Sequence, residues 1–249
     1  MPSSPLTIAI DGPSGSGKSS VSKAVARELG LGYLDTGAMY RAVAWHCLDQ
    51  EVDLTDQEAV AQAARDLPLE ISTDPDDQTL RVGGTDITSA IRETRVTSQV
   101  STVATNLDVR AELRRRQREI ISEARDERGG IVAEGRDITT VVAPDAEHRI
   151  LVTASEEARL ARRSTELHGG ADADQVEATR DQIVRRDRQD STVSAFMEAA
   201  DGVVTLDTSE LDFDQVVAAV LALVRGEVEP AQHEEEPATS PDGHAGGPA

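Results

Sequence analysis

The segment from Gly12 to Ser19, GPSGSGKS, has the residue types and the spacing of a phosphate-binding loop, G-x-x-x-x-G-K-[ST]. Glycines let such a loop curl until successive backbone N–H groups converge on phosphate oxygens. Lys18 would then contact the β- and γ-phosphates, and the hydroxyl of Ser19 would coordinate Mg²⁺. We therefore predict a site for a nucleoside triphosphate and Mg²⁺. The residues predicted to bind this nucleotide are Gly12, Pro13, Ser14, Gly15, Ser16, Gly17, Lys18, Ser19 and Ser20.

Lysine is otherwise almost absent from the chain. Lys18 and Lys23 are the only lysines among the 25 basic residues, and all the others are arginines. A chain that uses arginine so consistently is expected to place lysine where a compact ammonium group must enter a crowded phosphate site.

The elements that must position this loop alternate regularly. An apolar, β-branched run ends at Asp11, and residues 20–30 after the loop have apolar side chains at helical spacing. Short apolar runs typical of buried strands recur later and alternate with helical patterns. The further predicted strands are residues 32–35, 131–135, 149–154 and 202–207, and the further predicted helices are residues 38–50, 156–167 and 211–224. We predict an α/β fold with a parallel sheet covered on both faces.

Two segments depart from this alternation. Residues 67–88 contain two alternating runs around DPDDQ and then a GG turn, which predicts a small antiparallel insert; the alternative is a loosely packed surface loop. From Gly226 the chain is acidic and proline-rich and lacks Lys and Arg, so we predict disorder there. We accordingly divide the chain into a nucleotide-binding domain at 1–225, with its insert at about 66–100, and a tail at 226–249.

The overall charge is strongly negative, with 25 basic and 46 acidic residues and a net charge of -21. A field of this sign repels nucleic acids and anionic membranes, so we expect neither as a partner. No segment has the length and apolar purity of a membrane span, and the N-terminus lacks the features of a secretory signal. Cys47, the only cysteine, cannot form an intrachain disulfide. We expect a cytoplasmic monomer with small molecules as its partners.

The motifs that the sequence lacks and the positions of its arginines narrow the class of protein. A guanine-nucleotide switch needs an Asn-Lys-x-Asp segment. This chain cannot contain one, because its only asparagine is Asn106 and its only lysines are Lys18 and Lys23. A nucleic-acid motor would need basic or aromatic tracks. A small kinase with an anionic acceptor remains, because Arg41 and Arg136 follow predicted strands at the sheet edge that binds ligands. By contrast, a solvated helix face paired with Glu112, Glu119 and Glu123 is expected for Arg114, Arg115, Arg116 and Arg118.

Three longer segments carry a more specific signal: IAIDGPSGSGKSSVSKAVARELGLGYLDTGAMYRA, VAEGRDITTVVAPDAEHRILVTASEEARLARR and RRDRQDS. In these segments the chain closely resembles the bacterial cytidylate kinases, the CMP/dCMP kinases of the nucleoside monophosphate kinase group. The resemblance runs from about Leu6 to Val224. It implies a five-stranded parallel sheet with flanking helices, a monophosphate-binding region that contains the insert, and a short mobile lid at about 155–190. It also implies transfer of the γ-phosphoryl group of ATP to CMP or dCMP.

The same resemblance implies roles for individual residues. Thr36 and Arg41 of DTGAMYR would grip the acceptor phosphate, and Arg136 of GRD would contact it. Tyr40 would shape the same pocket. The cytosine ring would be recognised by Ser101, Arg110 and Asp137, and the pentose by Arg186 and Asp190. Glu134 would order water bound to Mg²⁺. The implied catalytic residues, among them two lid arginines, are Lys18, Arg136, Arg159, Arg163 and Arg186.

Two positions depart from the common family pattern. Glu134 stands where relatives often carry Asp, and Val193 replaces the last arginine of the form RDxxDSxR. We expect Val193 to bring either a looser base selectivity or an equivalent contact elsewhere. On the residues alone, two other functions stay open: a kinase for another small acceptor, and a regulatory module that binds ATP and presents the insert to a protein partner.

Overall fold

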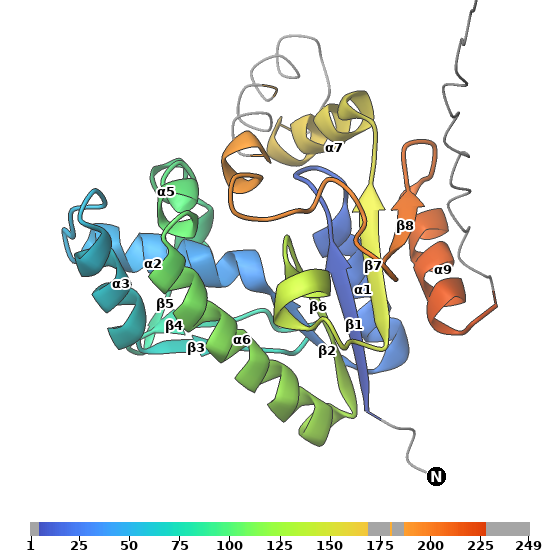
Figure 1. The fold of residues 1–249 in the computed structure, drawn as a ribbon, viewed down its shortest axis with the longest axis horizontal. Helices are drawn as coiled ribbons and strands as arrows, with labels where there is room; N and C mark the ends of the chain where they lie inside the picture. Colours follow the sequence, from blue (N-terminus) through green and yellow to red (C-terminus); the bar gives the residue numbers. More distant parts are fainter. Residues whose placement is uncertain (1–4, 169–179, 181–186, 228–249) are drawn as a thin grey trace, which may run out of the picture.

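A computed structural model describes residues 5–168, 180 and 187–227 of the chain. Its main sheet has the strand order β2-β6-β1-β7-β8, and every neighbouring pair is parallel (Figure 1). These strands are β1 (Leu6–Asp11), β2 (Gly32–Asp35), β6 (Gly130–Gly135), β7 (His148–Thr153) and β8 (Val204–Asp207). The predicted parallel α/β sheet is therefore confirmed. β8 begins later than predicted because Gly202, with a φ of 72°, forms a turn before it.

Side chains alternate between two cores, one on each face of this sheet. Ile8 and Ile10 of β1 pack with Val132, with α1 (Lys18–Leu29) and with α9 (Phe213–Val224). Ala9, between them, belongs to the other core, together with α2 (Thr36–Asp49) and α6 (Leu107–Arg128). Because both faces are covered, successive residues of β1 are buried, which explains why its sequence is almost continuously apolar.

Helices α1 and α2 begin earlier than their sequence patterns indicated. α1 starts inside the glycine loop, directly after Gly17 (φ 85°), and it ends at Gly30, whose φ of 67° gives the expected left-handed cap. α2 starts directly after Asp35, because the carboxylate of Asp35 accepts a hydrogen bond from the N–H of Ala38 (2.9 Å). Both helices follow parallel strands, so their N-terminal N–H groups lie at the same edge of the sheet.

The segment between α2 and α6 contains the predicted antiparallel insert. Its sheet has the order β3-β4-β5, formed by β3 (Leu69–Ile71), β4 (Leu80–Val82) and β5 (Thr85–Asp86). Gly83 and Gly84, with φ values of 56° and 81°, turn β4 into β5. Leu80 and Val82 are buried in the same core as α2 and α6, so the alternative of a loosely packed loop is wrong.

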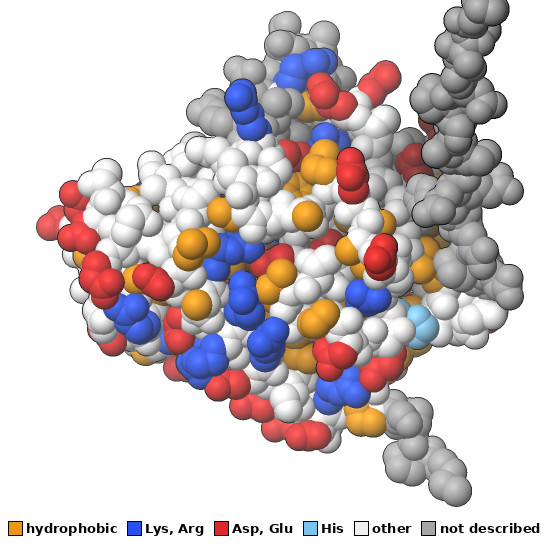
Figure 2. All heavy atoms as spheres, viewed as in Figure 1, with side chains coloured by type: hydrophobic (Ala, Val, Ile, Leu, Met, Phe, Trp, Pro, Cys, Tyr) orange, Lys and Arg blue, Asp and Glu red, His pale blue; other side chains and the backbone are white. Residues whose placement is uncertain are grey.

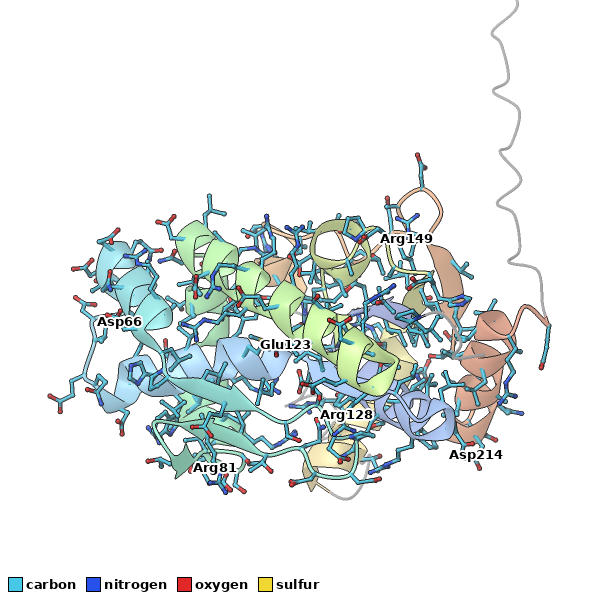
Figure 3. The ribbon with its side chains drawn as sticks, turned by 90° about the horizontal axis from the view of Figure 1, so that it is seen from below. Asp66, Arg81, Glu123, Arg128, Arg149 and Asp214 are labelled. Atoms are coloured by element: carbon cyan, nitrogen blue, oxygen red, sulfur yellow. The ribbon has the colours of Figure 1, made fainter. Side chains whose placement is uncertain are left out.

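The insert lies beside the β2 edge of the main sheet. The N–H of Tyr33 in β2 donates a hydrogen bond to the carbonyl oxygen of Thr73 (2.9 Å), which satisfies part of that edge. Figure 3 shows the small sheet, marked by Arg81, at the opposite end of the molecule from α9, marked by Asp214.

The remaining elements are mostly short, and the longest of them, α7, lies beside the glycine loop. They are α3 (Gln57–Asp66), η1 (Ala90–Arg92), α4 (Thr94–Thr97), α5 (Val100–Ala104), the wide helical turn η2 (Ile138–Val142) and α7 (Glu156–His168). Among the described residues, no helix has both the length and the apolar character needed to cross a membrane. Most of the predicted tail, residues 228–249, and much of the predicted lid, residues 169–179 and 181–186, lie outside the described residues.

Candidate active site

The glycine loop joins β1 to α1 at the carboxyl edge of the main sheet, and close packing fixes its path. Gly15 has a φ of 77°, and a Cβ atom added there would lie 2.6 Å from the carbonyl oxygen of Arg159 on α7. Any other residue would therefore clash with α7 and strain the backbone. The first turn of α1 follows at once, and its N-terminal dipole favours an anion at this edge.

Next to the loop, the carboxylate of Glu134 in β6 contacts both groups on which the chemistry of the motif depends. Ser19 Oγ donates a hydrogen bond to Glu134 Oε1 (2.6 Å), and Lys18 Nζ lies 3.8 Å from Glu134 Oε2. Burial of Glu134, together with the nearby charge of Asp35, raises its pKa to about 7, although Lys18 and Ser19 act in the opposite direction. A hydroxyl beside a carboxylate fits a Mg²⁺ ion whose other ligands are phosphate oxygens and water.

Two side chains of the DTGAMYR segment lie beside the end of β6. Thr36 Oγ1 donates to the carbonyl oxygen of Glu134 (2.8 Å), and Arg41 Nη2 donates to Asp35 Oδ2 (2.7 Å). Burial alone would raise the pKa of Asp35, but the guanidinium of Arg41 and the N–H of Ala38 hold it below its usual value. Arg41 is thus a cation fixed at the strand end by a carboxylate partner.

Further polar side chains from distant segments meet in a buried cluster. Arg110 Nη2 donates to Asp137 Oδ2 (2.6 Å) and to Ser194 Oγ (2.8 Å), and Ser101 Oγ donates to Asp190 Oδ1 (3.2 Å). Burial raises the pKa of Asp137, and the charge of Arg110 opposes that rise. The cluster offers both donors and acceptors in a desolvated setting, which is what selective recognition of a polar ring requires.

Arg136 connects the glycine loop to this cluster. Its Nη2 donates to Ser14 Oγ (2.7 Å), and its Nη1 lies 2.9 Å from Asp190 Oδ2. The guanidinium stacks over the ring of Phe196, with Cζ 4.4 Å from the ring centroid. One arginine therefore faces both the predicted triphosphate site and the predicted acceptor pocket.

Comparison with known proteins identifies the family. A family model described as Cytidylate kinase matches residues 8–226. The chain belongs to the cytidylate kinase family. The cytidylate kinase of Cutibacterium acnes is 49% identical over 225 residues, which are 90% of this chain and 98% of that protein. The cytidylate kinase of Streptomyces avermitilis is 47% identical over 220 residues, 88% of this chain and 92% of that protein. The resemblance inferred from the motifs is thereby confirmed, and this cytidylate kinase family member is a phosphotransferase.

The predicted site residues of this cytidylate kinase family member are mostly brought together by the fold. Arg159 of α7 reaches the loop, where its Nη1 donates to the carbonyl oxygen of Ser14 (3.0 Å). Tyr40 is partly buried against the core of α2 and α6, and burial raises its pKa. Arg163 lies half-buried on α7. Arg186 is among the residues that the structure does not describe, so its predicted role has no geometric counterpart here.

Asp11, which the sequence pattern marked only as the end of a strand, supports the candidate site from below the loop. Its carboxylate accepts hydrogen bonds from Ile138 N (3.0 Å), Thr139 N (2.8 Å) and Thr139 Oγ1 (2.6 Å). Burial raises the pKa of Asp11, and these hydrogen bonds lower it. Asp11 thus fixes η2, the turn that directly follows Arg136 and Asp137. The available signal was an acidic residue at the end of an otherwise apolar run.

The arginine-rich face of α6 follows the sequence expectation only in part. Figure 2 shows basic side chains gathered over α6, with acidic side chains around them. Arg115 pairs with Glu112 (2.8 Å) and Glu119 (2.6 Å), as expected for a solvated face. The prediction is wrong for Arg118, which donates to the carbonyl oxygens of residues 141 and 142 (2.6 and 3.0 Å) and so joins α6 to η2.

Proposed function

We propose that this chain transfers the γ-phosphoryl group of ATP to CMP or dCMP, giving ADP and CDP or dCDP. The observation that carries the proposal is the position of Arg136, which contacts Ser14 of the glycine loop and Asp190 of the polar cluster at the same time. A transferring phosphoryl group passes between two such sites, so a cation that faces both is suited to its charge.

On the donor side, we assign the phosphates of ATP to residues 12–20, with Lys18 beside the β- and γ-phosphates. Ser19 and Glu134 fit a magnesium ion held jointly with the nucleotide: Ser19 as a direct ligand and Glu134 through water. When bound there, Mg²⁺ neutralises charge that develops on the phosphate oxygens. Within the described residues, no group of three or more His, Cys, Asp or Glu side chains could hold a metal ion.

On the acceptor side, we assign the monophosphate to Thr36, Tyr40, Arg41 and Arg136, which lie near the carboxyl ends of β2 and β6. Arg110, Asp137 and Ser101 would bind the cytosine ring, because a buried ion pair and a hydroxyl present complementary donors and acceptors. Asp190, with Arg186, would hold the pentose. Arg159 and Arg163 would approach the transferring group from α7.

The chemical step needs positioning and cations rather than a base. Phosphoryl transfer passes through a loose transition state whose charge spreads over the equatorial oxygens. The acceptor phosphate is already largely ionised near neutral pH, so we assign no general base. We also propose that the insert and a lid at about 155–190 exclude water during transfer.

The deciding experiment is ADP formation from ATP and Mg²⁺ with CMP, dCMP, UMP, AMP and GMP offered in turn, beside a control without acceptor. We expect rapid turnover with CMP and dCMP and little in the control. Equal ADP formation without acceptor would indicate a regulatory module or an ATPase. Preference for a different acceptor would indicate another kinase and would contradict the roles of Arg110 and Asp137.

We further propose that the protein acts as a cytoplasmic monomer that binds neither nucleic acid nor membrane, with residues 1–225 as the kinase domain and 226–249 as a solvated tail. The net charge of -21 supports the absence of polyanionic partners. Light scattering at micromolar protein concentration, with and without ATP, tests the monomer.

A further inference from the structure

Asp187 contacts the glycine loop and two arginines beside it, although no local sequence pattern indicates these contacts. Its Oδ1 accepts a hydrogen bond from the backbone N–H of Ser14 (3.1 Å) and lies 3.1 Å from Arg136 Nη2. Its Oδ2 lies 2.5 Å from Arg159 Nη1. Asp187 is 7% exposed, and the side chains of Arg136 and Arg159 are 13% and 9% exposed, so these contacts are largely desolvated.

These three donors are of the kind that bind a phosphate. A backbone N–H of a glycine loop and two arginines converge on the two oxygens of one carboxylate, as they would on two oxygens of a phosphoryl group. The nearby carboxylate of Asp190 contacts Arg136 (2.9 Å) and the hydroxyl of Ser101 (3.2 Å).

A desolvated carboxylate on these donors opposes phosphate binding in two ways. A phosphate that uses the N–H of Ser14, Arg136 or Arg159 has to exchange with Asp187 for the same hydrogens. An anionic phosphate close to an anionic Asp187 is also repelled, and low exposure leaves little water to screen that repulsion.

We propose that Asp187 is a positioning residue that acts as an internal substitute for a donor phosphate. It holds Arg136 and Arg159 beside the loop, and the phosphates of ATP take over these donors as Asp187 withdraws. The inference rests on the proposed function only in assigning the loop to ATP. Asp187 therefore lowers the affinity for ATP while it keeps the two arginines in place for catalysis.

The test is the dissociation constant of ATP with Mg²⁺ and without CMP, measured by calorimetry on the full chain and on Asp187→Asn. We expect the variant to bind ATP about tenfold more tightly, because the competing charge is gone. Glu157→Gln, on the exposed first turn of α7, is the matched control, since it removes one charge from an element beside the loop. Binding by Asp187→Asn that is equal to or weaker than that of the control would overturn the proposal.

The melting temperature gives a second measurement. Without nucleotide, Asp187→Asn should melt earlier, since Arg136 and Arg159 lose a buried partner, and ATP should raise its melting temperature more than that of the unmodified protein. Asp187→Ala is the second variant, because it cannot turn an amide N–H₂ toward Arg159. Both variants could melt below the assay temperature. In that case the increase in melting temperature caused by ATP is compared with the increase in Glu157→Gln, and an increase that is no larger overturns the proposal.

Steady-state kinetics separate this role from a structural one. The proposal expects a lower KM for ATP together with a several-fold lower kcat in Asp187→Asn, whereas loss of local structure would raise KM. If the unmodified protein bound no ATP, the proposed function itself would be contradicted. If it bound ATP and Asp187→Asn bound ATP with the same affinity, only the role of Asp187 would be contradicted.

Discussion

The two halves of the candidate site are built in different ways. The donor half is one continuous loop, Gly12 to Ser19, whose shape follows from glycines and from the start of α1. The acceptor half collects side chains from α2, α5, α6, the end of β6 and the segment after residue 187. Its cations are held by internal carboxylates, Arg41 by Asp35 and Arg110 by Asp137.

This difference separates affinity for phosphate from choice of acceptor. A loop of backbone N–H groups binds any triphosphate, so it says little about what else the enzyme binds. An anion that binds between paired side chains breaks their hydrogen bonds. If it does not replace those hydrogen bonds, its binding free energy becomes less favourable, and this loss is large because the pairs are buried. We therefore expect the acceptor half to determine selectivity.

The largest expected effect concerns the donor half. We expect Lys18→Ala to lower kcat by about a thousandfold or more while the protein still folds, because the lysine supplies charge mainly to the transferring phosphates. Lys23→Ala is the matched control, since it removes the only other lysine from the same helix. Near-normal kcat in Lys18→Ala, measured by ADP formation with CMP, would contradict the assignment.

The next effect concerns Glu134, which contacts Ser19 of the donor half and Thr36 of the acceptor half. Its pKa is about 7 in the folded protein against 4.5 for the free side chain. A raised pKa contributes stability that is fully present below about pH 4.5 and is lost as pH rises through about 7, a difference of about 3 kcal/mol.

The free energy of unfolding in buffer with EDTA should therefore fall more steeply with pH in the unmodified protein than in Glu134→Gln. Urea unfolding at half-unit steps between pH 5 and pH 8 measures this. Parallel curves for the two proteins would show that Glu134 ionises in the folded state at its ordinary pKa.

A smaller effect is expected in the acceptor half. Asp137→Asn keeps the shape of the side chain but removes the charge that faces Arg110. We expect the ratio of kcat/KM for CMP to that for UMP to fall roughly thirtyfold, because the amide replaces one of the two accepting oxygens of the carboxylate with a donating NH₂ group. Asp145→Asn, at an exposed position after η2, controls for the change of charge. An unchanged ratio would remove Asp137 from recognition of the base.

The smallest effect is expected from the tail. Deleting residues 228–249 spares the hydrogen bonds that Gly226 N and Glu227 N donate to the carbonyl oxygens of α9. We expect kcat and KM to stay within about twofold, because an acidic, proline-rich segment buries little surface. A clear rise in affinity for ATP on deletion would show instead that the acidic tail opposes nucleotide binding.

The same contrast explains how far the sequence could be interpreted. The donor loop was predictable because its residues are contiguous and its pattern has a direct physical meaning. Asp187 was not, because it lies 173 positions from Ser14, its partner in the loop, and no local pattern links the two. The start of α1 was placed too late because the glycine loop itself supplies the first helical residues. Arg118 was misassigned because only the folded chain places the carbonyl groups of η2 beside α6.

The contacts of Asp11 also limit how the loop could be reused in protein engineering. The residue just before Gly12 is tied by three hydrogen bonds to Ile138 and Thr139, far along the chain. Moving residues 11–19 alone onto another parallel sheet would leave the Asp11 carboxylate without those partners. The smallest transferable unit is therefore β1 and the loop together with β6 and η2, and an inserted unit of that kind would already contain Arg136, which contacts Ser14 of the loop.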